Sequence, residues 1–259
     1  MAQITLKSAA EVELMREAGA LVAATLHLVG ENIAPGMTTS DIDKLVEDNI
    51  LAAGATPAFK GYHGYPASAC VSVDEQVVHG IPGSRILQDG DIVSVDVGVV
   101  LNEWYGDSAA TYAVGEISEA KQKLMDVTRE SLFCGIEKVR NGVRLGVVSA
   151  AIQEYAESRG YSVVRDLVGH GIGRQMHEEP QVPNYGSPDK GPILKTGMVI
   201  AIEPMINAGG YEVLQKKDGW TIVTADDQPS AHFEHTVAVT DSGADILSLL
   251  KTEKMEKSA

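Results

Sequence analysis

The sequence predicts an α+β chain in two related halves, each a pair of helices followed by antiparallel strands, with the halves fused around one shared sheet. Three observations predict this class. Apolar residues recur at helical spacing in two pairs of segments, and they alternate in two pairs of shorter runs. Both patterns repeat at offsets of 106 to 107 residues. Such a repeat indicates an internal duplication, over about residues 10–114 and 118–240.

The first half opens with two predicted helices, over residues 10–29 and 36–54. In the second of them Thr39 or Ser40 is the expected N-cap, because a hydroxyl there accepts a hydrogen bond from an amide of the first turn. Gly54 is the expected end, since glycine readily adopts the left-handed conformation that follows many helices. The helical periodicity is carried by Ile42, Leu45, Val46 and Ile50.

Two strands are predicted to follow, over residues 90–96 and 107–114. Strand alternation places Asp96 on the face opposite a row of valines, namely Val93, Val95, Val97 and Val99. In the second strand Asp107 shares a face with Ala109 and Thr111. Each of these strands therefore presents one carboxylate on an otherwise apolar segment.

The second half repeats the helices, over residues 118–139 and 142–160. Ser118 is the expected N-cap of the first, and Gly160 is the expected end of the second. Gly142 and Gly160 lie 18 residues apart, as Gly36 and Gly54 do in the first half. The matched spacing supports the duplication.

The strands of the second half also repeat those of the first. Residues 197–203 have a glycine, an alternating apolar run and, six residues after the glycine, Glu203. Residues 233–239 form a further predicted strand, in which Glu234 shares a face with Thr236 and Ala238. Each half also holds a His-Gly-Ile sequence, at residues 79–81 and 170–172.

Length and charge exclude several classes of protein. Of the 259 residues, 44% are hydrophobic and 22% are charged, which is typical of a folded chain. A formal net charge of −15 disfavours binding to nucleic acid. No apolar run reaches the roughly 20 residues of a membrane span. We expect a single domain over residues 1–250, followed by a polar tail over residues 251–259, and a monomer.

Cysteine usage bears on the compartment. The chain has two cysteines, Cys70 and Cys134, which is too few for a disulfide framework. Its N-terminal region also lacks the basic start of a secretory signal, because three glutamates lie among the residues ahead of the first apolar stretch. A reducing compartment fits best, and we expect the cytoplasm.

The four carboxylates on these strands predict a metal site. An ionised carboxylate is costly to bury unless a cation accompanies it, and Lys and Arg are scarce in these strands. Any one acid alone would more often mark an exposed strand face or a salt bridge. Four acids paired by the duplication, with a histidine, suit two divalent ions, which generate hydroxide and polarise a carbonyl. The donors favour Mn, Fe or Co, with Zn as an alternative.

Eight short strings follow one another along the chain, at residues 61–66, 78–82, 96–98, 106–109, 169–173, 176–180, 202–204 and 234–236. Together they resemble type I methionine aminopeptidase, in family order, over nearly the whole chain from the first helix to about residue 245. The resemblance implies the pita-bread fold, with a pseudo-twofold axis through a dinuclear site. It also implies removal of the initiator methionine from new chains whose second residue is small.

The resemblance assigns all five metal ligands of the family to residues of this chain. Asp96 would chelate one ion, Asp107 and Glu234 would bridge both ions, and His170 and Glu203 would complete the other. Glu203 would also act as the general base that moves a proton from water to the departing amine. These assignments are expectations of the family pattern.

Histidines outside the ligand set receive roles by the same resemblance. His79 would contact the scissile amide nitrogen, and His177 would stabilise the tetrahedral oxyanion. His63 lies beside the pocket by analogy and is assigned no chemistry. His232 and His235 flank Glu234; alternation puts His232 on the face of that carboxylate, and both are interpreted as supporting or structural.

The methionine side chain needs a soft apolar slot. The family pattern places six residues around it, namely Phe59, Tyr62, Tyr65, Cys70, Met176 and Trp220. Two of these depart from the pattern. Phe59 stands where a small residue, often cysteine, is common, and Met176 stands where an aromatic residue is usual. These departures concern the shape of the pocket rather than the reaction.

Three alternatives are less well supported. Proline-specific relatives usually carry an extra N-terminal domain, for which the early start of the first repeat leaves no room. The type II methionine enzyme usually has a long insertion between the His and Glu ligands, which here lie only 33 residues apart. A binding protein on the same fold would have lost ligands. Transient ribosome contact is a family expectation, although Lys216 and Lys217 form too small a basic cluster to argue it.

Overall fold

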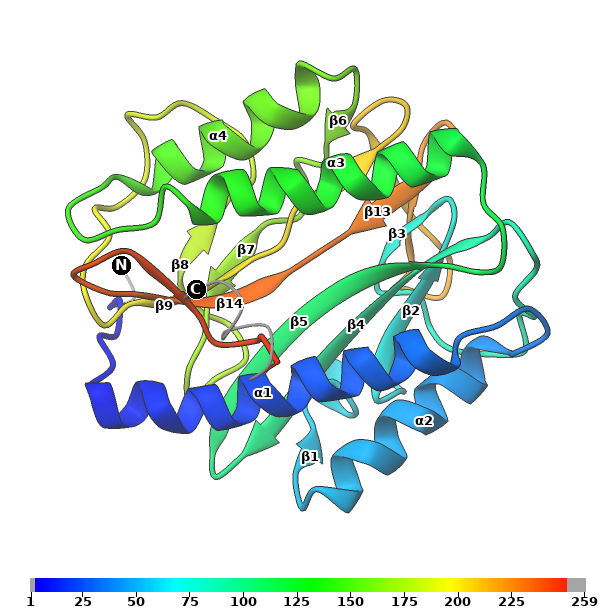
Figure 1. The fold of residues 1–259 in the computed structure, drawn as a ribbon, viewed down its shortest axis with the longest axis horizontal. Helices are drawn as coiled ribbons and strands as arrows, with labels where there is room; N and C mark the ends of the chain where they lie inside the picture. Colours follow the sequence, from blue (N-terminus) through cyan, green and yellow to red (C-terminus); the bar gives the residue numbers. More distant parts are fainter. Residues whose placement is uncertain (1–2, 251–259) are drawn as a thin grey trace.

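The computed structural model describes residues 3–250 and places two pairs of helices on either side of a set of strands (Figure 1). The first half supplies the lower pair in that view and the second half supplies the upper pair. The helices are α1 (Ala9–Asn32), α2 (Thr39–Ala52), α3 (Glu119–Ile136) and α4 (Leu145–Glu157). The predicted tail over residues 251–259 lies outside the described residues.

Hydroxyl caps start three of the four helices. The Ser8 and Ser118 hydroxyls each accept an amide N–H of the first turn of α1 and α3, which confirms Ser118. The prediction of Thr39 or Ser40 for α2 was wrong, because Thr38 is the cap. Thr38 and Asp41 bond each other's backbone amides reciprocally, and this capping box fixes the start earlier than the apolar pattern indicates.

The sheet of the first half is built around β4. Its strands are β1 (Thr56–Pro57), β2 (Ala69–Val73), β4 (Ile92–Leu101) and β5 (Trp104–Ala113), all paired antiparallel in the order β1-β4-β2 with β5 on β4. The valine face of β4 is buried against α1 and α2, as alternation predicts. Each fully buried valine contributes about 1.5–3 kcal/mol, so this face anchors the strand that carries Asp96.

The sheet of the second half has the order β15-β14-β9-β7-β8. Ile200 and Ile202 of β9 pack into the core under α3 and α4, which turns Ala201 to the opposite face. The predicted strand 233–239 begins later than expected, at His235, so Phe233 and Glu234 lie just before it. These strands are β7 (Gly169–Gly171), β8 (Glu178–Val182), β9 (Val199–Ile202), β14 (His235–Val239) and β15 (Ala244–Ile246).

Shorter strands complete the architecture and link the halves. The second half holds a sheet of order β13-β10-β6, and a further sheet of order β11-β12-β3 spans both halves. In the latter, Ile222 pairs with Val78 of the first half. The strands are β3 (Gln76–Val78), β6 (Ser162–Val163), β10 (Met205–Asn207), β11 (Val213–Gln215), β12 (Ile222–Thr224) and β13 (Ser230–His232).

The two halves also meet where β5 runs beside β13 and β14, and side-chain hydroxyls make the joint. The Thr236 hydroxyl accepts the Asp107 N–H at 3.3 Å and donates to the Asp107 carbonyl at 2.7 Å. The Thr111 hydroxyl donates to the His232 carbonyl at 2.8 Å and accepts its N–H at 3.0 Å. The two halves are therefore joined here through side chains as well as through the backbone bond from the Glu234 N–H to the Ala109 carbonyl.

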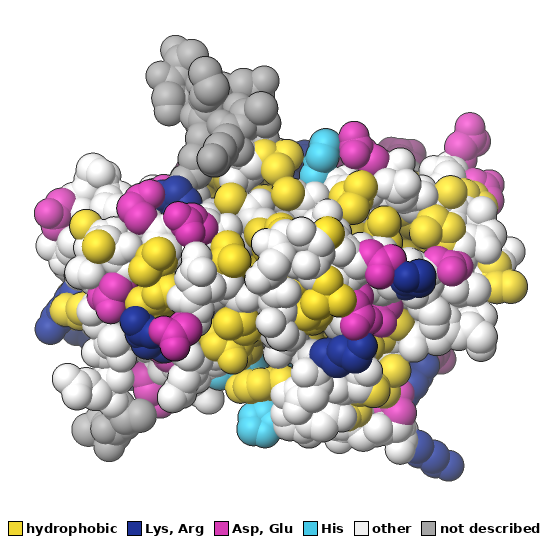
Figure 2. All heavy atoms as spheres, turned by 90° about the horizontal axis from the view of Figure 1, so that it is seen from below, with side chains coloured by type: hydrophobic (Ala, Val, Ile, Leu, Met, Phe, Trp, Pro, Cys, Tyr) yellow, Lys and Arg dark blue, Asp and Glu magenta, His cyan; other side chains and the backbone are white. Residues whose placement is uncertain are grey.

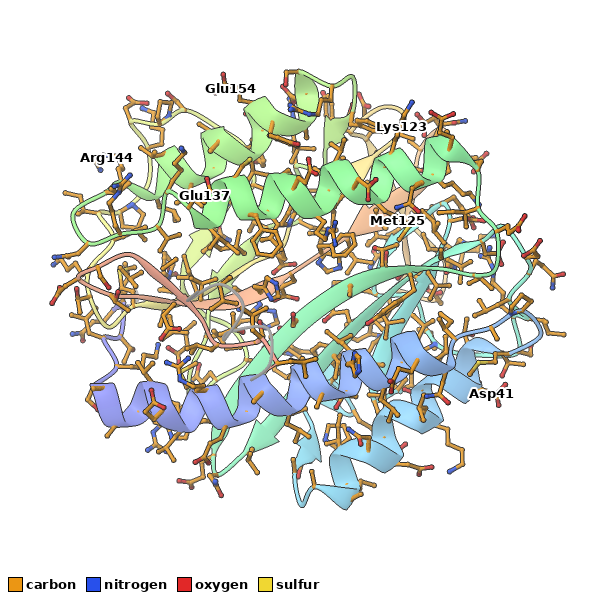
Figure 3. The ribbon with its side chains drawn as sticks, viewed as in Figure 1. Asp41, Lys123, Met125, Glu137, Arg144 and Glu154 are labelled. Carbon is orange, nitrogen blue, oxygen red and sulfur yellow. The ribbon has the colours of Figure 1, made fainter. Side chains whose placement is uncertain are left out.

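The outer surface is mixed in character. Lys123 on α3 and Glu154 on α4 are exposed, and so is Glu137, which caps the end of α3 (Figure 3). Seen from the side of α1 and α2, acidic and basic side chains are interspersed with apolar ones (Figure 2). None of the helices within residues 3–250 is long and apolar enough to cross a membrane.

Candidate metal centre and adjoining pocket

The predicted ligands converge on one cavity of about 230 Å³ between the two halves. All four carboxylates and His170 line it, together with both histidines that were assigned catalytic roles. The remaining lining residues are Phe59, Tyr62, His63, Tyr65, Cys70, Met176 and Trp220. The structure therefore gathers the assigned residues around one cavity.

Antiparallel pairing brings the acids of the first half together. Asp96 of β4 lies opposite Ala109 of β5, and Asp107 of β5 lies opposite Gly98 of β4. The two carboxylates therefore project from neighbouring strands on the face that the valines leave free. The tight ladder between these ten-residue strands fixes both backbones.

The second half brings its three groups to the same point by different means. His170 of β7 pairs with Ala201, two residues before Glu203. Glu203 directly follows β9, and Glu234 directly precedes β14. The Glu234 backbone N–H donates to the Ala109 carbonyl at 2.9 Å, which ties this carboxylate to β5.

The distances between donor atoms fit a shared cation. His170 Nε2 lies 3.7 Å from Asp107 Oδ2 and 3.6 Å from Glu203 Oε1. One donor atom from each of Asp107, His170 and Glu234 lies within 4.8 Å of the others. Because metal–ligand bonds to N and O are about 2.0–2.2 Å long, two donors on one ion are separated by roughly 3–4 Å.

The carboxylates are strongly destabilised as anions. Burial raises the pKa of Asp96 to about 7. Burial also raises the pKa of Asp107, and the nearby Glu234 and Asp96 raise it further. The pKa of Glu203 and of Glu234 is raised for the same reasons, by burial first and by neighbouring carboxylates second. The cluster thus lacks positive charge.

Three unpartnered carboxylate oxygens within residues 3–250 indicate where a cation would bind. Within residues 3–250, Oδ1 of Asp96, Oδ1 of Asp107 and Oε1 of Glu234 are buried and have no hydrogen-bond partner. Such atoms are rare in native proteins unless a water or an ion satisfies them. Hard carboxylate oxygens with one imidazole nitrogen form a donor set for divalent ions, so the residues present fit a metal.

His170 is prepared as a ligand rather than as a cation. Burial lowers its pKa to about 3, with a further lowering by His177. Its Nδ1 lies 2.9 Å from the Gly171 carbonyl, which can only accept a hydrogen bond. Nδ1 therefore carries the proton, and the lone pair of Nε2 faces the carboxylates.

His79 and His177 lie at the cavity without joining the acid cluster. Burial lowers the pKa of His79 to about 4 and also lowers that of His177, so both are neutral near pH 7. The Tyr62 hydroxyl lies 2.7 Å from His177 Nδ1. The backbone of His79 lies in the left-handed region, at φ 58°. The Trp220 ring meets the His79 ring edge to face, with 6.3 Å between the ring centroids.

The apolar wall of the cavity matches the predicted pocket. Phe59, Tyr65, Cys70 and Met176 are all buried and belong to one apolar cluster, against which Tyr62 and Trp220 pack. The Tyr65 hydroxyl donates towards the Gly80 carbonyl at 2.9 Å, and burial raises its pKa. Burial next to Asp96 also raises the pKa of the Cys70 thiol.

Sequence reasoning missed the partner of Phe59. A Cβ at Gly98 would lie 2.6 Å from Cε1 of the Phe59 ring and 3.0 Å from the Ala58 Cβ. The ring therefore occupies space that is open only because residue 98 is glycine. The Asp-Val-Gly string contained this signal, since a glycine inside a strand often marks a close approach.

The two histidines beside Glu234 point to different places. His232 is buried, and its Nε2 lies 3.9 Å from Glu203 Oε2. Its two ring nitrogens have no hydrogen-bond partner among residues 3–250. His235 Nδ1 instead lies 2.9 Å from the Ser248 hydroxyl. Alternation therefore predicted correctly that His232 faces the acid cluster and that His235 does not.

Comparison with known proteins agrees with this site. The profile of metallopeptidase family M24 matches residues 13–241. The methionine aminopeptidase of Clostridium perfringens is 54% identical over 96% of this chain and all of its own length. Methionine aminopeptidase 1 of Bacillus subtilis is 53% identical over 95% of this chain and 99% of its own.

The solved structures agree as well. Methionine aminopeptidase from Thermotoga maritima superposes with a TM-score of 0.94 at 50% identity, over 95% of this chain and 100% of that one. The match confirms the pita-bread fold that the resemblance implies. Family membership also implies divalent-metal binding, which the buried cluster fits. The chain therefore belongs to metallopeptidase family M24 and, within it, to the methionine aminopeptidases.

Proposed function

We propose that the chain hydrolyses the first peptide bond of newly made proteins and peptides that begin with methionine and have a small second residue. The observation that carries this proposal is the junction of two surfaces in one cavity. A buried cluster of unpartnered carboxylate oxygens forms one side, and an apolar wall that includes Met176 and Phe59 forms the other. The first suits a charged reaction centre, and the second suits a thioether side chain.

The proposed ligands are the five residues of the cluster, with two divalent ions drawn from Mn, Fe, Co or Zn. Asp96, Asp107 and Glu234 supply the orphaned oxygens that support this assignment. His170 and Glu203 face each other at 3.6 Å and are assigned to the same ions. When bound, such ions polarise a carbonyl and lower the pKa of water.

Glu203 is the proposed general base. Its pKa is raised by burial and by two neighbouring carboxylates, so it holds a proton more readily than an exposed glutamate. A carboxylate of this kind takes a proton from water and returns it to the departing amine. Its place directly after β9 gives it a fixed backbone.

Two neutral histidines complete the proposed machinery. If the Tyr62 hydroxyl donates to Nδ1 of His177, at 2.7 Å, then Nε2 of His177 carries the remaining proton. That N–H is available to the oxyanion that develops on the scissile carbonyl. His79 also lines the cavity and is proposed to contact the amide nitrogen that departs.

The setting of the reaction is part of the proposal. We infer a monomeric cytoplasmic enzyme whose single catalytic domain spans residues 1–250 and meets nascent chains near the ribosome, with no specific nucleic-acid binding. The free thiols of Cys70 and Cys134 support a reducing compartment. The net charge of −15 supports the absence of specific nucleic-acid binding, and on the face drawn in Figure 2 acidic and basic side chains are interspersed.

The test is release of methionine from the peptide Met-Ala-Ser by chain loaded with Mn or Co, with a chelator as control. Glu203→Gln is expected to lower kcat at least 100-fold, the usual contribution of a general base, while circular dichroism stays unchanged. Glu154→Gln, an exposed change on α4, is the matched control and retains activity. Cleavage of Xaa-Pro peptides in place of Met-Ala-Ser, or normal turnover by Glu203→Gln, contradicts the proposal.

A further inference from the structure

The segment ahead of α1 carries a lysine into the interior of the second half. Lys7 is buried, at 6% exposure, although lysine is almost never fully buried unless it is paired. Its backbone N–H donates to the Gly197 carbonyl at 2.7 Å. A Cβ at Gly197 would lie 2.6 Å from the Lys7 carbonyl oxygen, so the segment lies directly against the chain just before β9.

The amine of Lys7 ends on a carboxylate 171 residues away. Its Nζ lies 2.6 Å from Glu178 Oε2, and the two side chains are 2% and 13% exposed. The other oxygen of Glu178 accepts the backbone N–H groups of Arg174 at 2.8 Å and Gln175 at 3.2 Å. One carboxylate therefore joins the N-terminal segment to the loop over residues 173–178.

Gly173 shows how closely this loop is built around the ion pair. A Cβ at this position would lie 2.6 Å from Glu178 Oε1 and 2.6 Å from Lys7 Cε. The Gly173 carbonyl also accepts the Tyr105 N–H at 2.9 Å, which ties the start of the loop to β5. The loop is thus anchored at its start by a strand and at its end by the ion pair.

His177 is the residue next to Glu178, and its side chain lines the cavity that holds the carboxylates. Its ring lies 4.2 Å from that of His170, centroid to centroid, and its Nδ1 contacts the Tyr62 hydroxyl. We propose that the Lys7–Glu178 ion pair is a positioning device, which holds the loop so that His177 reaches the bond being cleaved. This inference rests on the proposed function of His177, and Lys7 acts only through Glu178.

The alternative is that the pair only supports the fold. A buried ion pair is weak support for stability in itself, but loss of one partner leaves an uncompensated charge. Every variant is therefore expected to lose some stability, and thermal midpoints cannot decide the matter. The deciding readouts are the kcat and KM for peptide, the affinity for Mn, and hydrogen exchange of the loop amides.

The experiment compares Lys7→Met with Lys7→Arg and with the control Arg16→Met. Arg16 binds Asp245 at 2.5 Å, so the control also breaks an ion pair between the N-terminal region and the second half, but away from the loop. Lys7→Met is expected to lower kcat for Met-Ala-Ser about tenfold or more, because small misplacements of catalytic groups are costly. The KM and the Mn affinity of Lys7→Met are expected to stay within about twofold of those of the unaltered chain. Lys7→Arg is expected to keep part of the kcat that Lys7→Met loses. Arg16→Met is expected to have an unchanged kcat.

Two further readouts test the route through the loop. The amides of Arg174 and Gln175 are expected to lose protection from exchange in Lys7→Met, while those of β4 keep it. In a His177→Ala background, Lys7→Met is expected to cause no further loss of kcat, because the two changes remove the same contribution. If Lys7→Met does not fold, Glu178→Gln replaces it, since the amide oxygen still accepts the loop N–H groups while the charge is lost.

Unchanged kcat in a folded Lys7→Met variant overturns the proposal, and so does an equal, additive loss in the His177→Ala background. Unchanged protection of the loop amides overturns it as well. These outcomes differ from a failure of the proposed function. If the unaltered, metal-loaded chain releases no methionine from Met-Ala-Ser, the assignment of the reaction fails, whereas the exchange experiment still decides whether Lys7 holds the loop.

Discussion

In the metal-free chain, the free energy of unfolding is expected to fall as the pH rises. Burial raises the pKa of Asp96 from 3.8 to about 7 in the folded chain. Between these values the metal-free folded chain binds more protons than the unfolded chain, so raising the pH favours unfolding. One pKa unit corresponds to about 1.4 kcal/mol, and the loss from Asp96 alone between pH 5 and pH 8 is about 3 kcal/mol. The pKa values of the other three carboxylates are raised as well, so these groups add to the same loss.

Bound metal reverses this trend, because the ligands are then deprotonated and paired with positive charge. At 100 times its dissociation constant a metal adds about 2.7 kcal/mol. For a chain of this size each kcal/mol moves the melting temperature by about 2–4 °C. The loss of about 3 kcal/mol from the metal-free chain is therefore expected to widen the gap between metal-loaded and metal-free melting temperatures by about 6–12 °C from pH 5 to pH 8.

Differential scanning calorimetry with Mn or with chelator, at four pH values, measures that gap directly. The comparison cancels groups that titrate identically in both forms. Asp96→Asn is the informative variant, since a neutral amide removes one of the titrating groups. The melting temperature of its metal-free form should fall less steeply with pH, and metal should raise that temperature by less. A gap that stays constant or narrows towards pH 8 would refute the reasoning about buried carboxylates.

Two further predictions concern the pocket. Gly98→Ala is expected to raise the KM for Met-Ala-Ser roughly tenfold, because overpacking of this kind costs about 1–3 kcal/mol and drives the Phe59 ring into the cavity. Adding Phe59→Ala to the Gly98→Ala variant should lower the KM part of the way back. An unchanged KM for Gly98→Ala would show that the ring can move elsewhere. Tyr62→Phe removes the hydroxyl that binds His177 and is expected to lower kcat about fivefold, which matches the loss of a hydrogen bond of about 1 kcal/mol. Tyr185→Phe is the control. A normal kcat for Tyr62→Phe would argue that His177 is oriented without the Tyr62 hydroxyl.

The sequence allowed the faces of the strands to be predicted because alternation is local. The period of two turns Asp96 away from the valines that pack on α1 and α2, whatever the rest of the fold does. The same rule placed Glu203 opposite Ile200 and Ile202. Helix caps were less secure, since Thr38, Thr39 and Ser40 all carry hydroxyls and only the reciprocal bonds with Asp41 select the first of them.

Pocket composition was predicted through the family resemblance, but its packing was not. The resemblance places Phe59 and Met176 at the pocket, yet it does not reveal that the Phe59 ring fills the space above Gly98. Likewise no local pattern links Lys7 to Glu178, because the pair joins residues 171 positions apart. Contacts of this range depend on the assembled fold and leave little trace in one sequence.

The joint between the halves shows why convergence of the acids also lay beyond pattern reasoning. A regular ladder holds neighbouring strands about 4.7–4.9 Å apart. Where β5 meets β14, the Thr236 hydroxyl instead binds both backbone groups of Asp107, and the Ser108 hydroxyl donates to the Glu234 carbonyl. The Glu234 backbone N–H also donates to the Ala109 carbonyl at 2.9 Å, so side-chain and backbone groups together hold the two halves at this joint. No pattern within either half encodes these bonds, so the convergence of the four carboxylates on one cavity depends on how the two halves assemble.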